Sequence, residues 1–325
     1  FSDNLIAYSI ILALWGAGLQ LFYRFYCYKR FAETHLSFCR EKKVYTEMLS
    51  YSLWDTVGAF CATGNYQGIN ILMNVFFGVT VNAARQVSYQ VETGINQLAS
   101  NLVTSINPQI VKNYANGDYK RFFQLIYEGG RYAYYLMFFI AFPVCLEANY
   151  ILHLWLVEVP EYSVLFLRFV LCISLFRMFS RSILSGVHAT GNVKTLNLTS
   201  GVYSAGTFLP AVYIAYKLDA PVWSCFVIQS FNLCICTMFE VRALYKQIHF
   251  NIADYFIKVY AYSIGVSLVS IIPSVLLVWL LEPSFLRLIL TLVISTISLS
   301  FCIYTIGINK DTRSKINKFV FNKIR

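Results

Sequence analysis

The sequence has little charge. Asp, Glu, Lys and Arg together make up 13% of its 325 residues, whereas hydrophobic residues make up 58%, and the mean hydropathy is +0.57. A soluble domain built around one apolar core rarely reaches such values. The scarcity of charge therefore excludes an ordinary soluble domain and predicts a membrane protein whose apolar surface faces lipid.

Histidines and regularly spaced cysteines are also scarce. The chain has four histidines, all near predicted loops: His35, His153, His188 and His249. None of them has an acid at the helical spacing that would suggest general-base catalysis. The nine cysteines lie mostly within apolar runs, where Cys acts as a small hydrophobe, and Cys234 and Cys236 have no second pair at zinc spacing. We therefore predict neither a catalytic residue nor a metal site.

Nine apolar stretches are long enough to cross a bilayer, since a spanning helix needs about 20 predominantly apolar residues. The stretches cover residues 5–23, 49–77, 85–106, 122–146, 161–186, 195–216, 221–239, 256–281 and 285–306. We therefore predict an all-α fold, a polytopic transmembrane helical bundle of about nine spans.

The loops between these stretches alternate in charge. Every second loop, beginning with residues 24–48, and the tail at 309–325 carry most of the 26 basic residues, and the opposite loops carry acids instead. Because Lys and Arg collect in cytoplasmic loops, we expect a cytoplasmic C-terminus and contact of the basic loops with anionic membrane lipids. No basic patch accompanies an element that could read a nucleic-acid groove, so the net charge of +10 does not predict nucleic-acid binding.

Polar side chains recur at helical spacing in the second and third spans. They are Thr63, Gln67, Asn70 and Asn74 in the second, and Gln86, Gln90, Thr93, Gln97 and Asn101 in the third, with Asn96 on a neighbouring line. Polar groups at membrane depth usually line a cavity or hydrogen-bond a neighbouring helix, and both readings stay open. A stripe that crosses most of the bilayer exceeds what one helix contact requires, which favours a cavity.

Four arginines fall within the fourth and fifth apolar spans: Arg131 in the fourth, and Arg168, Arg177 and Arg181 in the fifth. A guanidinium group suits bidentate contact with phosphate, so Arg131, Arg177 and Arg181 are candidate ligands of an anionic or phosphorylated group. Alternatively, the side chains of Arg177 and Arg181 extend to the lipid headgroups of the inner leaflet. For Arg131 the alternative is an ion pair with Glu128. Asp55 and Glu92 are the acids available for coupling to H⁺ or Na⁺.

Four runs carry a resemblance to a known family. They are NVFFGVTVNAARQVSYQV at 74–91, NPQIVKNYANGDYKR at 107–121, ILHLWLVEVPEY at 151–162 and HATGNVK at 188–194. The chain resembles Wzx-type polysaccharide repeat-unit flippases of the multidrug/oligosaccharidyl-lipid/polysaccharide (MATE-like) exporter superfamily. This resemblance implies two six-helix lobes, sometimes with two further C-terminal helices.

On that template the chain is N-terminally incomplete, lacking the first five helices. Residues 1–28 would be the last helix of the N-lobe, 29–48 a cytoplasmic connector, 49–246 the six-helix C-lobe, 247–308 two additional helices, and 309–325 a basic cytoplasmic tail. The family placement thus agrees with the orientation expected from the loop charges.

The resemblance also implies a function without covalent chemistry, in which the polar stripes would face the sugars and Arg131, Arg177 and Arg181 would hold the pyrophosphate. Such a protein flips undecaprenyl-pyrophosphate-linked oligosaccharides across the bacterial inner membrane by alternating access, for O-antigen of lipopolysaccharide, capsule or exopolysaccharide. It needs no cofactor beyond a coupling H⁺ or Na⁺, and its partners include the polysaccharide polymerase and chain-length machinery. The alternatives are a MATE-type drug/cation antiporter, a lipid II flippase and, less favoured, a membrane-bound polymerase or acyltransferase.

Overall fold

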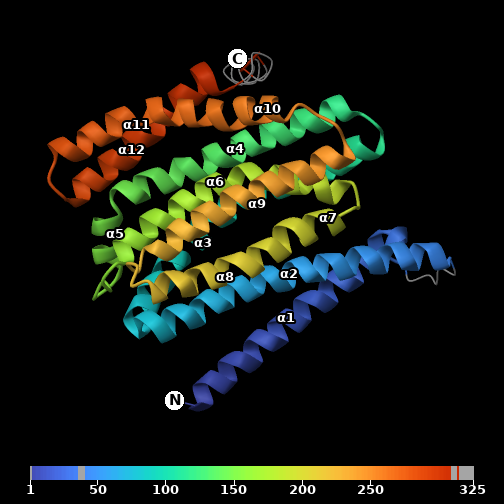
Figure 1. The fold of residues 1–325 in the computed structure, drawn as a ribbon, viewed down its shortest axis with the longest axis horizontal. Coiled ribbons are helices and arrows are strands. Elements are labelled where there is room, and N and C mark those ends of the chain that lie inside the picture. The colour runs from blue at the N-terminus through green and yellow to red at the C-terminus, as the bar shows by residue number, and fades with distance from the viewer. Residues whose placement is uncertain (1, 36–40, 309–312, 315–325) are drawn as a thin grey trace. The chain divides into compact units, whose positions relative to one another are not determined.

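The computed structural model describes residues 2–35, 41–308 and 313–314; the regular elements among them are helices joined by short loops, with no β-strand. The chain divides into two units, Phe1–Ser50 and Tyr51–Arg325, each of which is considered by itself. Figure 1 shows the succession of helices along the chain.

The first unit holds α1 (Ser2–Arg30), the short 3₁₀ turn η1 (Ala32–Thr34) and the beginning of α2 (Lys42–Phe77). Two basic residues, Lys29 and Arg30, lie in the last turn of α1, where the negative end of the helix dipole stabilises positive charge. Residues 36–40 of the expected connector lie outside the described residues.

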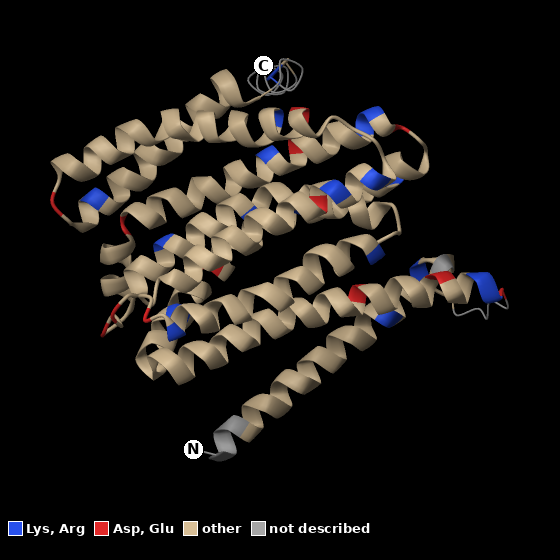
Figure 2. Ribbon diagram, viewed as in Figure 1, with Lys and Arg blue, Asp and Glu red and all other residues tan. Residues whose placement is uncertain are grey.

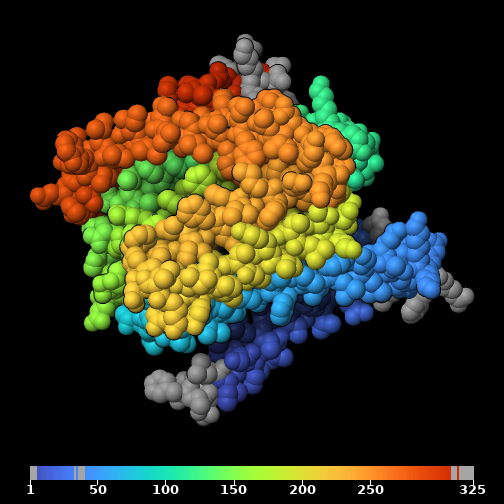
Figure 3. All heavy atoms as spheres, in the orientation of Figure 1, coloured from blue at the N-terminus to red at the C-terminus, as the bar shows by residue number. Residues whose placement is uncertain are grey.

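The second unit contains the rest of α2 and all later helices. These are α3 (Val79–Ala115), α4 (Tyr119–Leu146), α5 (Ala148–Trp155), α6 (Ser163–Ala189), α7 (Lys194–Leu196), η2 (Asn197–Gly201), α8 (Val202–Lys217), α9 (Ser224–Gln247), α10 (Ile252–Tyr255), η3 (Phe256–Ala261), α11 (Tyr262–Leu280), α12 (Phe285–Cys302) and η4 (Ile303–Gly307). The segments η2, η3 and η4 are π-helical. In the space-filling view α8, α9 and α11 share the face turned toward the viewer (Figure 3).

Tight turns reverse the chain between the first helices of this unit. Gly78 has φ of 89° between α2 and α3, and Gly117 has φ of 72° between α3 and α4. Glycine adopts these left-handed conformations without a Cβ clash. Asp118 then caps α4, because its side chain accepts a hydrogen bond from the Arg121 amide at 3.0 Å.

Helices α3, α4 and α6 form the centre of the second unit, and α9 packs on α6. Phe122, Ile126 and Phe179 are fully buried in this core. Gly186 on α6 permits close approach to α4, since a Cβ there would lie 2.8 Å from Ile126 Cδ1. A side chain at this position would therefore require the terminal methyl group of Ile126 to move.

Six helical segments are long and apolar enough to span a membrane. They are Ile6–Arg30, Tyr119–Leu146, Ser163–Ala189, Ser224–Gln247, Ile252–Leu280 and Phe285–Gly307. An all-α, multi-pass membrane protein is thus confirmed by helix length and hydropathy.

The other three expected spans, 49–77, 85–106 and 195–216, fall on α2, on α3 and on the run from α7 to α8, none of which is among the six. The polar stripes explain the difference for α2 and α3, because amide and hydroxyl side chains lower the hydropathy of helices that are long enough to cross. The count of nine spans stays a prediction.

Helices α11 and α12 pair with each other and lie beside α4 (Figure 1). Hydroxyl groups join the pair: Ser295 Oγ donates to Ser274 Oγ at 2.9 Å, and Ser298 Oγ donates to the Ser270 carbonyl at 2.9 Å. Small polar residues of this kind allow helices to approach closely and hydrogen-bond within lipid.

A buried ion pair attaches α12 to the end of α4. Arg287 donates to Glu147 Oε2 at 2.7 Å, and the two side chains are 10% and 0% exposed. Thr291 Oγ1 donates to the other carboxylate oxygen at 3.1 Å, and the Arg287 guanidinium also donates to the Leu281 carbonyl at 2.9 Å. Both carboxylate oxygens are thereby satisfied in a site closed to solvent.

We expect Arg287→Leu to destabilise the protein, because it leaves the Glu147 carboxylate buried without its cation. Loss of one partner of a buried pair costs about 3–5 kcal/mol of unfolding free energy, and the midpoints of thermal and denaturant unfolding of the purified protein measure it. Replacing both residues by Leu should restore much of the loss. A double variant as unstable as the single one would contradict the assigned pairing.

Candidate functional site

The polar stripe on α3 lies on the surface of the second unit. Gln90, Thr93, Gln97 and Asn101 are all exposed. Their hydrogen bonds stay within α3: Thr93 Oγ1 donates to the Tyr89 carbonyl at 2.7 Å, and Gln97 Nε2 donates to Asn101 Oδ1 at 3.1 Å. Among the described residues none of these four side chains bonds to another helix. The polar groups thus remain available to a ligand or to water.

The stripe on α2 meets the one on α3 at Asn70. Gln86 Nε2 donates to Asn70 Oδ1 at 2.7 Å, and Arg85 donates to the same oxygen. Asn70 Nδ2 in turn donates to Gln67 Oε1 at 3.4 Å. Thr63, Gln67 and Asn74 are exposed. The structure therefore joins the two stripes at the level of Asn70 and Gln86.

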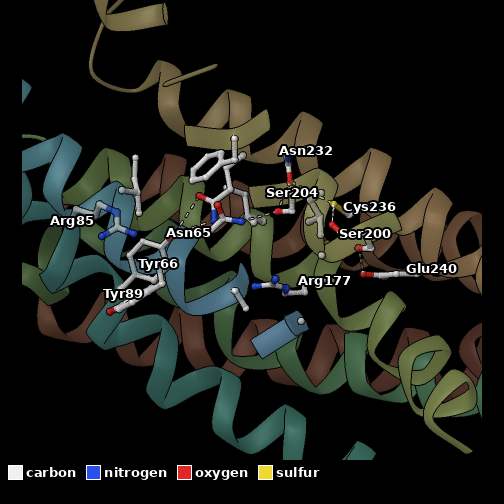
Figure 4. A pocket seen from close by; sticks show the side chains of 18 residues that line it. Asn65, Tyr66, Arg85, Tyr89, Arg177, Ser200, Ser204, Asn232, Cys236 and Glu240 are labelled. Atoms are coloured by element: carbon white, nitrogen blue, oxygen red, sulfur yellow. Dashed lines mark hydrogen bonds between the residues drawn. The ribbon is translucent and has the colours of Figure 1, made fainter. Parts of the chain in front are cut away.

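Behind this face the second unit contains a cavity of about 290 Å³. Side chains from α2, α3, α6, η2, α8 and α9 line it, and its polar members are Asn65, Tyr66, Arg85, Tyr89, Arg177, Ser200, Ser204, Gln229, Asn232 and Glu240. Figure 4 shows Arg85, Tyr66 and Tyr89 together at one end, Glu240 and Ser200 at the other, and Ser204 between them. The cavity therefore carries both signs of charge: the Glu240 carboxylate lies at one end, the Arg85 guanidinium at the other, and Arg177 also lines it (Figure 4).

Hydrogen bonds connect the helices across the middle of the cavity. Asn65 Nδ2 donates to Ser204 Oγ at 2.9 Å, and Ser204 Oγ donates to Asn232 Oδ1 at 3.0 Å. Tyr89 and Gln229 are hydrogen-bonded at 3.2 Å. Two buried acceptors on the cavity wall, Asn65 Oδ1 and Glu240 Oε2, have no partner among the described residues. Such acceptors can take hydrogen bonds from a polar occupant.

Arg85 is held at the cavity end by aromatic rings. Its side chain is almost completely buried, and its guanidinium carbon lies 4.5 Å from the centre of the Tyr89 ring and 5.6 Å from that of Tyr66. Cation–π contacts and the Asn70 hydrogen bond compensate part of the cost of burying this charge. Arg85 is a component of the site that sequence reasoning did not select.

The three arginines singled out from the sequence do not lie together. Arg177 is exposed and lines the cavity, and Arg181 is half-buried one helical turn further along α6. Arg131 is buried on α4, where its guanidinium carbon lies 5.7 Å from the centre of the Tyr262 ring. Arg131 lines a different groove, between α4 and the C-terminal helices.

The two selected acids also differ in placement. Glu92 is 6% exposed and accepts hydrogen bonds from Ser174 Oγ at 2.5 Å and Asn96 Nδ2 at 2.8 Å. Asp55 is exposed on α2 and does not line the cavity. The carboxylate that does line it is Glu240, which accepts from Ser200 Oγ at 3.4 Å. The described residues contain no group of three or more His, Cys, Asp or Glu that could hold a metal ion.

Half of the polar lining comes from η2, α8 and α9, where the sequence carried a signal that was not used. Ser200, Ser204 and Thr207 follow spacings of 4 and 3. Gln229, Asn232, Cys236 and Glu240 follow spacings of 3, 4 and 4. Each set falls on one helical face. The same periodicity that identified the stripes on α2 and α3 would have located these residues.

No family model matches the chain, and no match was found among curated proteins or among solved structures. The geometry therefore defines the site without help from relatives. It offers amide, hydroxyl and guanidinium groups suited to hydrogen-bonding a polar ligand.

We expect cysteines at positions 90, 97 and 101 to react with a water-soluble, membrane-impermeant thiol reagent, because these side chains are exposed on a polar face. The variants Gln90→Cys, Gln97→Cys and Asn101→Cys are made in a background whose native cysteines are replaced by alanine. Labelling is followed by mass spectrometry of the protein in its membrane.

The matched control is Ala99→Cys on the same helix, where the side chain is fully buried and should stay unlabelled. Protection of all three stripe cysteines, with or without substrate, would show that the stripe is a helix interface and not a wet surface.

Proposed function

We propose that the protein flips a lipid-linked oligosaccharide, an undecaprenyl-pyrophosphate-linked repeat unit, across the bacterial inner membrane. The observation that carries the proposal is the joined polar face of α2 and α3, from Thr63 and Asn74 to Asn101, which adjoins a polar cavity. Polar groups at membrane depth are costly and are retained where they serve a pathway. Amides and hydroxyls match the hydroxyl groups of a sugar chain.

The arginines of α6 supply the charge that the pyrophosphate requires. Arg177 lines the cavity and Arg181 follows it by one turn, so both guanidinium groups can approach one anionic group. Guanidinium contacts to phosphate are strong because they are charge-assisted and bidentate. Arg131 lies in a separate groove and has no part in this assignment.

The proposed cycle is alternating access, in which helical lobes rock about a central substrate path. The resemblance to Wzx-type flippases supplies this mechanism, together with the bacterial inner membrane and the polymerase and chain-length partners. The six candidate spans found by helix length and hydropathy are compatible with alternating access. The acids and arginines of the bundle bind or orient groups of the substrate, and no covalent bond is broken.

Replacing both Arg177 and Arg181 by Ala should abolish surface polysaccharide, because the pyrophosphate loses both of its proposed ligands. The test is complementation of a flippase-deleted bacterial strain with the full-length protein, with membrane protein level measured in parallel. Arg168→Ala is the matched control, since Arg168 is an exposed arginine of the same helix that donates to the Cys145 carbonyl at 3.3 Å. Full complementation by the double variant would reject the assigned role.

A cation antiporter is the second candidate, and two buried carboxylates favour it. Glu92 and Glu240 both lie within the bundle, and a carboxylate in such a position can bind H⁺ or Na⁺. The same acids also suit an ion-coupled flippase. Movement of a fluorescent cation by the purified protein, without movement of lipid-linked oligosaccharide, would select the antiporter.

If Glu240 couples flipping to protons, Glu240→Gln should remove the response to a pH gradient, because the amide cannot bind and release a proton. Flipping of a fluorescent lipid-linked oligosaccharide in proteoliposomes measures it, with and without an imposed pH gradient, and with a sodium gradient as a parallel condition. The exposed loop variant Glu158→Gln should retain the response. An unchanged response in Glu240→Gln would assign coupling to another group.

A further inference from the structure

A second groove lies away from the polar cavity, where the C-terminal helices meet α4. It has a volume of about 570 Å³, within the roughly 300–1,000 Å³ range of small-ligand sites. One helical stripe of α4 forms one wall, and Lys258 of η3 with Tyr262 of α11 forms the other. The lining residues are Lys120, Phe123, Gln124, Tyr127, Glu128, Arg131, Lys258 and Tyr262.

The groove combines cations with aromatic rings. Lys120 and Lys258 are exposed, and Lys120 makes no ion pair within the described part of the chain. Lys258 Nζ lies 2.7 Å from Asp254 Oδ2 in a pair open to solvent, which an incoming anion can share. Figure 2 shows acidic and basic residues gathered where α10 and η3 run beside α4. With Asp254, the partner of Lys258, the groove carries three cations against two carboxylates, so its balance favours an anion.

The groove lies at one end of α4, at the level expected for lipid headgroups. The 28 residues of α4 extend over about 42 Å, whereas the hydrocarbon core of a bilayer is about 30 Å thick. The excess of about 12 Å corresponds to at most about eight residues, so Lys120 and Gln124 in the first turns can project beyond the acyl chains, whereas Glu128 lies at their boundary. Tyr127 and Tyr262 suit the same level, since tyrosine rings collect at the membrane–water interface.

Close packing holds the two walls at a fixed separation. Val259 of η3 packs on Gly130 of α4, where an added Cβ would lie 3.3 Å from Val259 Cγ1. Tyr255 is fully buried and donates to the Phe179 carbonyl at 2.8 Å. The floor of the groove is thus built before any ligand binds, which limits the ordering cost of binding.

We propose that this groove binds the phosphate headgroup of an anionic phospholipid and that the bound lipid strengthens the attachment of the C-terminal helices to α4. Lys120 and Lys258 contact the phosphate from opposite walls, and Tyr127 and Tyr262 pack against the glycerol and the first part of the acyl chains. Basic pockets between transmembrane helices on the cytoplasmic side are typical sites for anionic headgroups. The proposal requires a multi-pass membrane protein and is independent of the transported substrate.

The test compares the full-length protein with Lys120→Ala plus Lys258→Ala. The probes are phosphatidylglycerol, zwitterionic phosphatidylethanolamine and inorganic phosphate, each added to purified protein in a neutral detergent. Native mass spectrometry counts retained lipid, and the thermal-unfolding midpoint reports stabilisation. The control is Arg242→Ala plus Lys246→Ala, which removes the same charge from exposed residues of α9 outside the groove.

We expect phosphatidylglycerol, but neither phosphatidylethanolamine nor inorganic phosphate, to raise the midpoint of the wild type. The groove variant should lose roughly 10- to 30-fold in affinity, because each cation near an anionic surface contributes about fivefold, while the control keeps the wild-type response. If the double variant folds poorly, Lys120→Ala alone should show a partial loss.

Three outcomes would overturn the proposal. Equal losses in the groove and control variants would indicate general attraction to a basic surface. Equal stabilisation by phosphatidylethanolamine would show that the charge of the headgroup is not recognised. Stabilisation by inorganic phosphate would assign the groove to a soluble phosphate ligand.

Discussion

The cost of an unsatisfied polar group in a low-dielectric interior governs this structure. Backbone groups meet that cost by forming helices throughout the described residues. Side chains meet it by pairing. Glu147 has both carboxylate oxygens bonded by Arg287 and Thr291, and Glu92 is bonded by Ser174 and Asn96. Where pairing is complete the polar group fixes one helix against another, as Glu147 does for α12 and α4. Incomplete pairing leaves a group available to something else, and this contrast separates structural from functional polar residues.

The proposed substrate path follows from incomplete pairing. Gln90, Gln97 and Asn101 stay exposed with bonds confined to their own helix, whereas the side-chain oxygen of Asn70 accepts from both Arg85 and Gln86. The exposed part of the stripe can therefore exchange partners as a ligand moves along it. The part bonded at Asn70 serves as a fixed joint between α2 and α3. A sugar chain, with many weakly held hydroxyl groups, suits a row of exchangeable donors and acceptors better than a single tight site would.

The sequence predicted the helical class and the membrane location well, because hydropathy and the 3.6-residue period are local properties. One of its three candidate arginines, Arg177, lines the cavity, but the junction of the two stripes at Asn70 was not predicted. Sequence reasoning failed where the answer depended on which helices are neighbours. Arg131 could not be separated from Arg177 by spacing, since only the packing of α4 against α11 shows that it faces another groove. The partner of Glu147 is 140 residues away, beyond any local pattern. Arg85 was not selected from the sequence, and only the packing of its guanidinium against the rings of Tyr66 and Tyr89 shows it as a buried wall of the cavity.

Two attachments of different character hold the C-terminal helices to α4. At one end of α4 the Glu147–Arg287 pair is closed to solvent, and both carboxylate oxygens are hydrogen-bonded. Toward the other end, contact runs through η3, where Lys258 and Asp254 form an exposed pair and a groove remains open. A buried pair resists change because breaking it leaves a bare charge, whereas an exposed pair contributes little and rearranges easily. Any motion of α11 and α12 relative to α4 should therefore pivot about Glu147 and open at η3. An anion held between Lys120 and Lys258 would oppose that opening, which makes the composition of the adjoining leaflet a determinant of how firmly these helices are held.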